Sequence, residues 1–170
     1  MKRTIHSKYL FHGVELPSTY VPPIIVAYNI RTPENVGSII RLADNIVCDK
    51  VLFVSDSNDI RESKIKKTAA SSFKSVNWKF CTQAELDNEI PDDYNLVAIE
   101  TTSDSENIYQ AKLQSKVAFV VGNEVAGVDD TFLDRCSKIV HIPIYGKNTS
   151  LNVSHALALA LFEWQRQMVL

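Results

Sequence analysis

The chain has 170 residues, of which 45% are hydrophobic and 22% are charged, and its formal net charge is −2. This length and composition suit one globular domain with its own core, and the charge excludes a strongly basic protein that coats nucleic acid. No apolar run is long enough to cross a bilayer and no signal peptide is visible, so we expect a cytoplasmic protein.

The first half of the chain alternates short apolar runs with amphipathic segments. Residues 24–28 predict a buried strand. Residues 33–47 predict a helix, in which Thr32 is the N-cap and Pro33 takes the first helical position. The remaining elements expected in this half are a strand over 51–54, a polar helix over 62–70, a strand over 76–80 and a short helix that the capping-box pattern opens at Thr82.

The second half continues the alternation and completes an α/β pattern. Residues 96–99 and 117–121 predict strands, and residues 150–168 predict a strong C-terminal helix. Short helices are expected near 108–113 and 130–136, and a last strand over 139–144. Alternating strands and helices of this kind predict a mostly parallel sheet with helices on both faces. We assign residues 1–20 to an N-terminal arm and 21–170 to a single domain.

Charge is distributed unevenly along the chain. Six cations against one acid lie between Arg61 and Lys79, whereas eight acids and no Lys or Arg lie between Glu85 and Glu106. If these segments fold apart, the protein has one positive and one negative face, although a solvated helix with loose charges explains the pattern equally well.

The cysteines and histidines give no sign of a disulfide framework or a metal site. The three cysteines, Cys48, Cys81 and Cys136, are scattered, which fits a reducing compartment. None of the four histidines has a partner at metal-ligand spacing, so no metal is expected.

The usual nucleotide-binding loops are absent from the sequence. The first strand is followed by Asn29-Ile30-Arg31-Thr32-Pro33, without G-x-G-x-x-G, and no Walker A sequence occurs. This weakens an ordinary dinucleotide fold, a P-loop enzyme, a glycine-loop methyltransferase and a flavodoxin-like domain.

Polar clusters instead follow the first strand, the strand at 117–121 and the last strand. Ligands of open α/β sheets bind beyond the carboxyl ends of strands, so the second and third clusters can share a ligand site. Each cluster alone also has a purely structural interpretation. Arg41 could pair with Asp44 or Asn45, Glu124 could cap the next helix, and Ser150 could be an N-cap.

Together and in this order, the clusters are specific. Asn-x-Gly-x-x-x-Arg at 35–41, Gly-Asn-Glu-x-x-Gly at 122–127 and Ile-Pro followed by Ser-Leu-Asn-Val-Ser-x-Ala at 142–156 resemble the SpoU (TrmH) family of RNA ribose methyltransferases, within the SPOUT class. The resemblance covers about residues 22–168.

The resemblance implies a C-terminal trefoil knot within about residues 95–168, a homodimer with the active site near its interface, and S-adenosylmethionine bound in the knot. We expect no metal, no DNA and no membrane among the partners. The implied catalytic residues are Asn35, Arg41, Glu124, Ser150 and Asn152. The implied cofactor-binding residues are Thr101, Thr102, Gly122, Glu124, Gly127, Ile142, Ile144, Ser150, Leu151 and Asn152.

Two departures from the family pattern affect these expectations. The loop at 101–107 lacks the glycine that many relatives carry, which leaves its cofactor contacts open. Many relatives also have an additional N-terminal RNA-binding domain, for which the residues before Ile24 are too few. The RNA would then be held by the domain, the dimer and the arm, and we favour tRNA over rRNA as the substrate.

We expect Arg41 to contact the target ribose and its phosphate, either as an activated base or as an electrostatic stabiliser of the developing alkoxide. The candidates for RNA contacts outside the active site are Arg31, Arg61, Lys64, Lys66 and Lys67, with Lys2, Arg3 and Lys8 of the arm. The alternatives are a SPOUT enzyme that methylates a base and a catalytically silent RNA-binding dimer.

Overall fold

The computed structural model describes residues 13, 15–55 and 60–169. Seven strands form one sheet in the order β3-β2-β1-β6-β4-β7-β5, and every neighbouring pair is parallel. The strands are β1 (Ile24–Tyr28), β2 (Lys50–Val54), β3 (Trp78–Cys81), β4 (Asn95–Ile99), β5 (Glu106–Asn107), β6 (Val117–Val121) and β7 (Lys138–His141). The parallel sheet predicted from the alternating pattern is confirmed.

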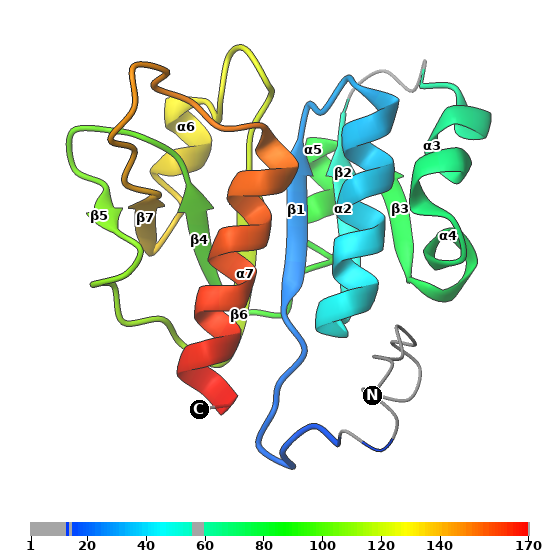
Figure 1. Cartoon of the computed structure of the whole chain (residues 1–170), viewed down its shortest axis with the longest axis horizontal. Helices are drawn as coiled ribbons and strands as arrows, with labels where there is room; N and C mark the ends of the chain where they lie inside the picture. The colour runs from blue at the N-terminus through cyan, green and yellow to red at the C-terminus, as the bar shows by residue number, and fades with distance from the viewer. Residues whose placement is uncertain (1–12, 14, 56–59, 170) are drawn as a thin grey trace, which may run out of the picture.

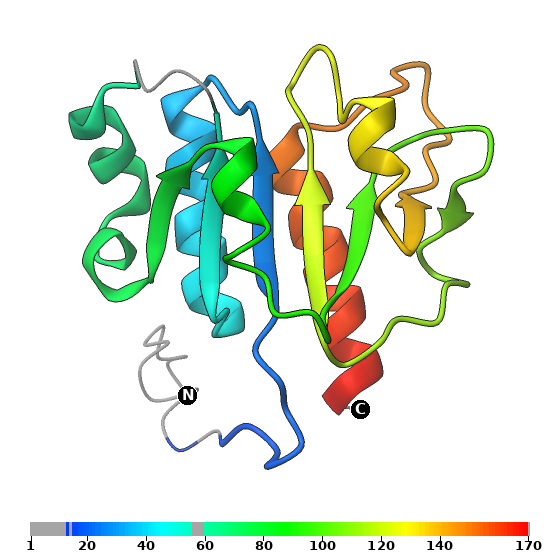
Figure 2. The same ribbon diagram turned by 180° about the vertical axis from the view of Figure 1, so that it is seen from behind.

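Helices cover both faces of this sheet. One face carries α2, α7, α3 and α4 (Figure 1), and the other carries the short helices α5 and α6 (Figure 2). Their bounds are α2 (Pro33–Ile46), α3 (Glu62–Ala69), α4 (Ser72–Ser75), α5 (Gln83–Leu86), α6 (Asp130–Leu133) and α7 (Val153–Val169). The arrangement is the three-layered α/β architecture expected for a parallel sheet.

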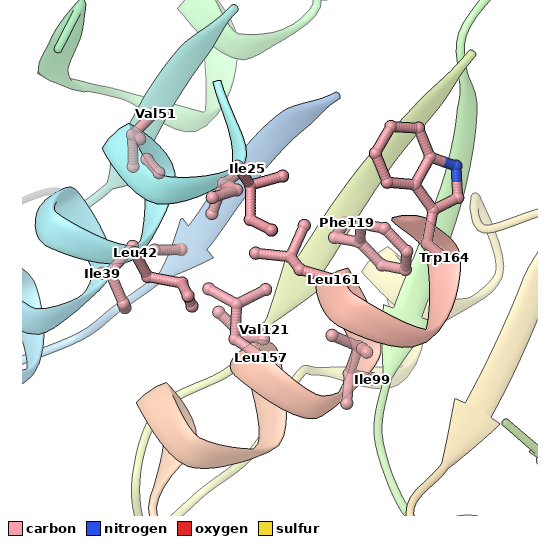
Figure 3. Packing of buried hydrophobic residues seen from close by; sticks show 14 of the residues in the cluster. Ile25, Ile39, Leu42, Val51, Ile99, Phe119, Val121, Leu157, Leu161 and Trp164 are labelled. Carbon is pink, nitrogen blue, oxygen red and sulfur yellow. The ribbon is translucent and has the colours of Figure 1, made fainter. Parts of the chain in front are cut away.

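The side chains of the central strand β1 divide between two cores. Because successive strand residues point to opposite faces, Ile25 and Ala27 join the core beneath α2 and α7, whereas Ile24 and Val26 join the core beneath α5 and α6. Figure 3 shows Leu157 and Leu161 of α7 in the first core, among side chains of the sheet and of α2. A strand buried on both faces is uniformly apolar, as the sequence of β1 is.

Gly37 allows α2 and α3 to pack closely. A Cβ atom at position 37 would lie 2.6 Å from Cβ of Thr68 and 2.8 Å from the backbone oxygen of Ile65. The glycine of the Asn-x-Gly-x-x-x-Arg motif therefore leaves room for α3 to pack against α2. As a result, α3 lies beside the α2 surface that carries Arg41.

The helix predicted near 108–113 is wrong. Ile108, Ala111 and Leu113 are buried, but this segment is irregular and follows the short strand β5. The side chain of Gln167 in α7 forms hydrogen bonds with the backbone of this segment. It donates to the oxygen of Ala111 and accepts from the nitrogen of Leu113, both at 3.0 Å. These contacts replace the hydrogen bonds that a helix would have made.

Other boundaries differ by a few residues. The last strand ends at His141 rather than 144, and α7 begins at Val153 rather than near 150. Most of the expected arm, including Lys2, Arg3 and Lys8, lies outside the described residues. The knot stays a prediction. None of the helices in the described part of the chain combines the length and hydropathy that a membrane crossing needs.

Candidate functional site

Loops at the carboxyl ends of β4, β6 and β7 surround a cavity of about 480 Å³. All three loops lie at the upper edge of the sheet in Figure 1. The second and third polar clusters therefore line one cavity, and its role as a shared ligand site stays a prediction. Its lining includes the following residues expected to hold a cofactor: Thr101, Gly122, Glu124, Gly127, Ile142, Ile144, Ser150, Leu151 and Asn152.

Two glycines shape the loop after β6. A Cβ atom on Gly122 would lie 2.2 Å from the backbone carbon of Gly127, so only glycine fits there. Gly127 itself has φ of +70°, a conformation that side chains disfavour. Backbone hydrogen bonds in both directions between Asn123 and Gly127, at 3.0 and 2.9 Å, close the loop into a tight turn.

Glu124 projects from this turn towards the start of α2. Its carboxylate accepts hydrogen bonds from the backbone nitrogens of Thr32 (3.2 Å) and Arg31 (3.4 Å) and from Nδ2 of Asn35 (2.8 Å). The Thr32 side chain makes no capping bond, so Glu124 supplies the negative group at the N-terminus of a helix distant in sequence. The alternative in which Glu124 caps the following helix is wrong, because Asp129 caps that helix through the nitrogen of Phe132.

The pKa of Glu124 lies below its ordinary value. Partial burial by itself raises the pKa, but the hydrogen bonds from Asn35, from its own backbone, and from Thr32 and Arg31 together outweigh it because they favour the charged form. Glu124 is therefore a carboxylate at neutral pH and acts as an acceptor towards the three groups around it.

Asn35 and Asn152 extend this hydrogen-bonded chain to α7. Asn35 is 7% exposed, and its Oδ1 accepts a hydrogen bond from Nδ2 of Asn152 at 3.0 Å. Oδ1 of Asn152 accepts from the nitrogen and the hydroxyl of Ser154, at 2.9 and 2.7 Å, and so caps α7. The sequence also allowed Ser150 as the cap of this helix; Ser150 instead lines the cavity.

Glu100 is a cavity residue that the sequence did not indicate. It follows β4 and accepts hydrogen bonds from the nitrogens of Thr101 (2.9 Å) and Val128 (3.2 Å). A Cβ atom on Gly127 would lie 2.5 Å from one of its carboxylate oxygens. The sequence gives no signal for Glu100, because both of its hydrogen-bond partners are backbone groups and one of them lies in a different loop.

Thr102 is not among the cavity-lining residues. Its hydroxyl donates to Asp104 at 2.8 Å and its nitrogen donates to the hydroxyl of Ser105 at 3.1 Å. The hydroxyl of Ser105 also lies 3.0 Å from Nδ1 of His141. The loop without the family glycine is thus held by its own side chains and by β7.

Arg41 lies in a second cavity, of about 280 Å³, between α2, α3 and the start of α7. Its neighbours in this lining include Asn45, Thr68, Ser154 and His155. Asp44, which could have paired with Arg41, accepts hydrogen bonds from Ser72 and Ser75 instead. Within the described part of the chain, the exposed Arg41 guanidinium forms no ion pair. The two cavities share no lining residue.

The expected RNA-contacting cations are exposed. Lys64, Lys66 and Lys67 lie on α3 and Arg61 is its N-cap, while Arg31 precedes α2. None of them forms an ion pair with a described residue, in contrast to Lys79, Lys116, Arg135 and Lys138 elsewhere on the protein.

A comparison with protein families matches residues 22–162 to the sequence model of the SpoU rRNA Methylase family. One curated relative, the 23S rRNA (guanosine-2′-O-)-methyltransferase RlmB of Blochmanniella floridana, is 28% identical over 164 residues. The alignment covers 96% of this chain and 65% of the relative, so the chain spans somewhat less than two thirds of that protein.

Solved structures resemble the fold closely. An RNA 2′-O ribose methyltransferase matches with a TM-score of 0.77 and 28% identity, over 98% of this chain and 61% of the other. An rRNA methyltransferase from Sinorhizobium meliloti with bound AdoMet matches with a TM-score of 0.79 and 22% identity, over 88% of this chain and 57% of the other, which shows a shared fold.

Proposed function

The chain belongs to the SpoU rRNA Methylase family, and from that premise we propose that it methylates a ribose 2′-hydroxyl of RNA with S-adenosylmethionine as the methyl donor. One observation carries the proposal. The cavity at the ends of β4, β6 and β7 is joined, through the hydrogen-bonded chain Glu124–Asn35–Asn152, to the helix that carries Arg41.

The cavity fits the donor in size and chemistry. Its volume of about 480 Å³ lies in the range of small-molecule sites, which is about 300–1,000 Å³. Ile142, Ile144 and Leu151 offer apolar surface for an adenine ring. In the described part of the chain, the backbone groups of the cavity-lining residues Ile142, Ile144 and 148–151 make no hydrogen bonds to other backbone groups, which leaves donors and acceptors free for the ring edge.

The glycines, Asn152 and Ser150 of the motifs are assigned roles from their contacts or from their positions at the cavity. When bound, S-adenosylmethionine supplies a methyl group on a positively charged sulfur. Gly122 and Gly127 give the loop the tight turn that borders the cavity, and Asn152 fixes the start of α7 against Asn35. Ser150 is exposed and lines the cavity, and it is the candidate to orient the target ribose.

Arg41 acts electrostatically in this proposal. Arginine keeps its positive charge across the physiological pH range, so it is a poor base but a strong partner for phosphate and for an oxygen that gains negative charge. The guanidinium is exposed and has no acidic partner among the described residues. It is therefore available to hold the phosphate beside the target ribose.

A second copy of the chain completes the site. Arg41 and the cofactor residues lie in separate cavities, and α7 exposes Leu159 (42%) and Phe162 (51%) beside the Arg41 cavity, which includes Ala158. Large apolar side chains exposed together on a helix mark an interaction surface. We place the partner protomer on this face, with the active site near the interface.

The RNA would run from the Arg41 cavity across α3. Thr68 belongs both to α3 and to this cavity, so the surface is continuous. Arg61, Lys64, Lys66 and Lys67 supply positive charge along it without acidic partners among the described residues. The curated relative acts on 23S rRNA by its name, whereas the sequence favoured tRNA, so both RNA classes belong in the experiment.

The test measures transfer of labelled methyl groups from S-adenosylmethionine to tRNA and rRNA that lack their native modifications. Arg41→Ala should abolish transfer. Arg135→Ala, which removes an arginine paired with Asp87 away from both cavities, serves as the control and should retain it. Recovery of the label as a 2′-O-methyl nucleoside identifies the ribose, and the labelled pool identifies the RNA class.

The other outcomes contradict the proposal in distinct ways. Recovery of the label on a base would show that the protein methylates a base and not the ribose. Cofactor binding without transfer to either pool would exclude these RNAs as substrates. Absence of both transfer and cofactor binding would favour a silent RNA-binding dimer of the same fold.

A further inference from the structure

Glu100 and Glu124 are the only acidic side chains among the described residues that line the cofactor cavity, and no described Lys or Arg lines it. The two carboxylates differ in their surroundings. Glu124 faces the positive N-terminal end of α2 and the amide of Asn35, which already complement its charge. Glu100 forms no ion pair with any described residue.

The position of Glu100 is fixed by the loops on either side of it. One carboxylate oxygen accepts from Thr101 in its own loop and the other accepts from Val128 beyond the turn after β6. The lack of a side chain at Gly127 permits this approach, because a Cβ atom there would lie 2.5 Å from Oε2. A partly buried carboxylate is thereby held at the wall of the cavity, where solvent screens its field less than at the surface.

The donor and the product of methyl transfer differ in charge. S-adenosylmethionine carries a sulfonium, an ammonium and a carboxylate, and is a net cation. S-adenosylhomocysteine has lost the methyl group and with it the sulfonium charge, and is net neutral. A wall with two carboxylates and no described Lys or Arg therefore attracts the donor more than the product.

We propose that Glu100 is a specificity-determining residue that makes the cavity prefer the cationic methyl donor over the neutral product. This inference rests on the proposed function, because it takes the cavity to be the cofactor site. It extends that function by explaining how product leaves: the loss of one positive charge weakens its attraction to Glu100.

Calorimetric binding of S-adenosylmethionine and S-adenosylhomocysteine tests the inference without requiring turnover. Glu100→Gln should weaken binding of the donor about fivefold, the effect of one partly screened charge pair, and change binding of the product by less than about twofold. The matched control is Asp92→Asn, which removes an exposed charge near the opposite end of β4 and should leave both affinities unchanged.

Equal weakening of both ligands by Glu100→Gln would overturn the inference, because it would show that Glu100 only holds the two loops together. A shift of the donor-to-product ratio in Asp92→Asn would overturn the assignment to this residue. Failure of the wild-type protein to bind either ligand would overturn the proposed cofactor site itself, which is a distinct result.

The wild-type protein provides a second measurement that does not depend on folding of the variant. Raising the salt concentration from about 50 mM to about 500 mM screens charge interactions. The preference for donor over product should fall across this range, and binding of sinefungin, which carries a protonated amine in place of the sulfonium, should weaken as that of the donor does. A ratio that does not change with salt would contradict an electrostatic preference.

Discussion

Asn35 donates a hydrogen bond from Nδ2 to Oε1 of Glu124 at 2.8 Å, across 89 positions of sequence. The same side chain accepts a hydrogen bond from Asn152 at 3.0 Å. A single buried amide thus connects the start of α2, the turn after β6 and the start of α7, the three places where the family motifs lie. Substitutions in this connection and on the surfaces around it should have measurable effects.

Asn35→Ala should lower the free energy of unfolding by about 1–3 kcal/mol, because it removes one hydrogen bond to a carboxylate and one to Asn152 in a buried place. Urea denaturation followed by circular dichroism measures the change. Asn45→Ala, on the exposed side of the same helix, should change stability by less than about 0.5 kcal/mol. Equal effects of the two substitutions would contradict a structural role for Asn35.

Gly122→Ala should reduce the affinity for S-adenosylmethionine by more than about tenfold, because the added Cβ collides with the backbone of Gly127 at 2.2 Å and forces the turn open. Calorimetry measures the affinity. Gly146→Ala is the control, since no atom lies within 4 Å of a Cβ placed there and its φ is not positive. A Gly122→Ala protein with normal affinity would show that the turn does not border the cofactor.

Acidification should remove the stabilising contribution of Glu124. Its folded-state pKa is depressed below the ordinary value of 4.5, so its contribution to stability is complete above that value and is lost as pH falls through the folded pKa. The difference in unfolding free energy between wild type and Glu124→Gln should therefore be constant above about pH 6 and shrink below about pH 4.5. A difference in unfolding free energy that grows on acidification would contradict a stabilising contribution from the charged form of Glu124.

Combined Lys64→Ala, Lys66→Ala and Lys67→Ala substitutions should weaken RNA binding and reduce its dependence on salt. Removal of one lysine–phosphate interaction lowers the slope of log affinity against log salt by about 0.7–0.9. Fluorescence anisotropy at several salt concentrations measures the slope. Lys79→Ala with Lys116→Ala, which removes cations already paired with Glu89 and Asp93, should leave it unchanged. An unchanged slope in the triple variant would exclude α3 from the RNA surface.

Phe162→Ser should convert the proposed dimer into a monomer or raise its dissociation constant by more than about tenfold, because a large aromatic anchor leaves the proposed interface. Analytical ultracentrifugation measures the change. Tyr109→Ser is matched in exposure, at 52% against 51% for Phe162, and lies in the loop after β5; it should have no effect. A protein that is monomeric at micromolar concentration before any substitution would contradict the proposed interface.

The sequence predicted the elements whose patterns depend on local structure. The apolar runs of β1, β2, β4 and β6 and the helix with Pro33 at its start were placed nearly to the residue. The capping box at Thr82 and Glu85 is present in the structure, because both partners lie within one turn. In these cases the residues that decide the conformation are neighbours in the chain.

The sequence did not predict the contacts whose two partners lie far apart in the chain. The apolar positions 108, 111 and 113 look helical, yet Gln167 of α7 binds the backbone there and makes a helix unnecessary. Glu124 caps α2, Asn152 joins the start of α7 to α2, and Glu100 bridges two loops, and in each case a partner lies far away in the sequence.

The sequence by itself determined that this is a parallel α/β protein with three polar clusters at the ends of its elements, because burial of alternating or continuous apolar residues is a local requirement. Only the tertiary structure decided that Glu100 belongs to the cavity that two of these clusters line, and that Arg41 lies in another cavity. The physical reason is that a parallel sheet collects the carboxyl ends of strands far apart in sequence at one edge, and the order of those strands is set by the packing of the whole chain.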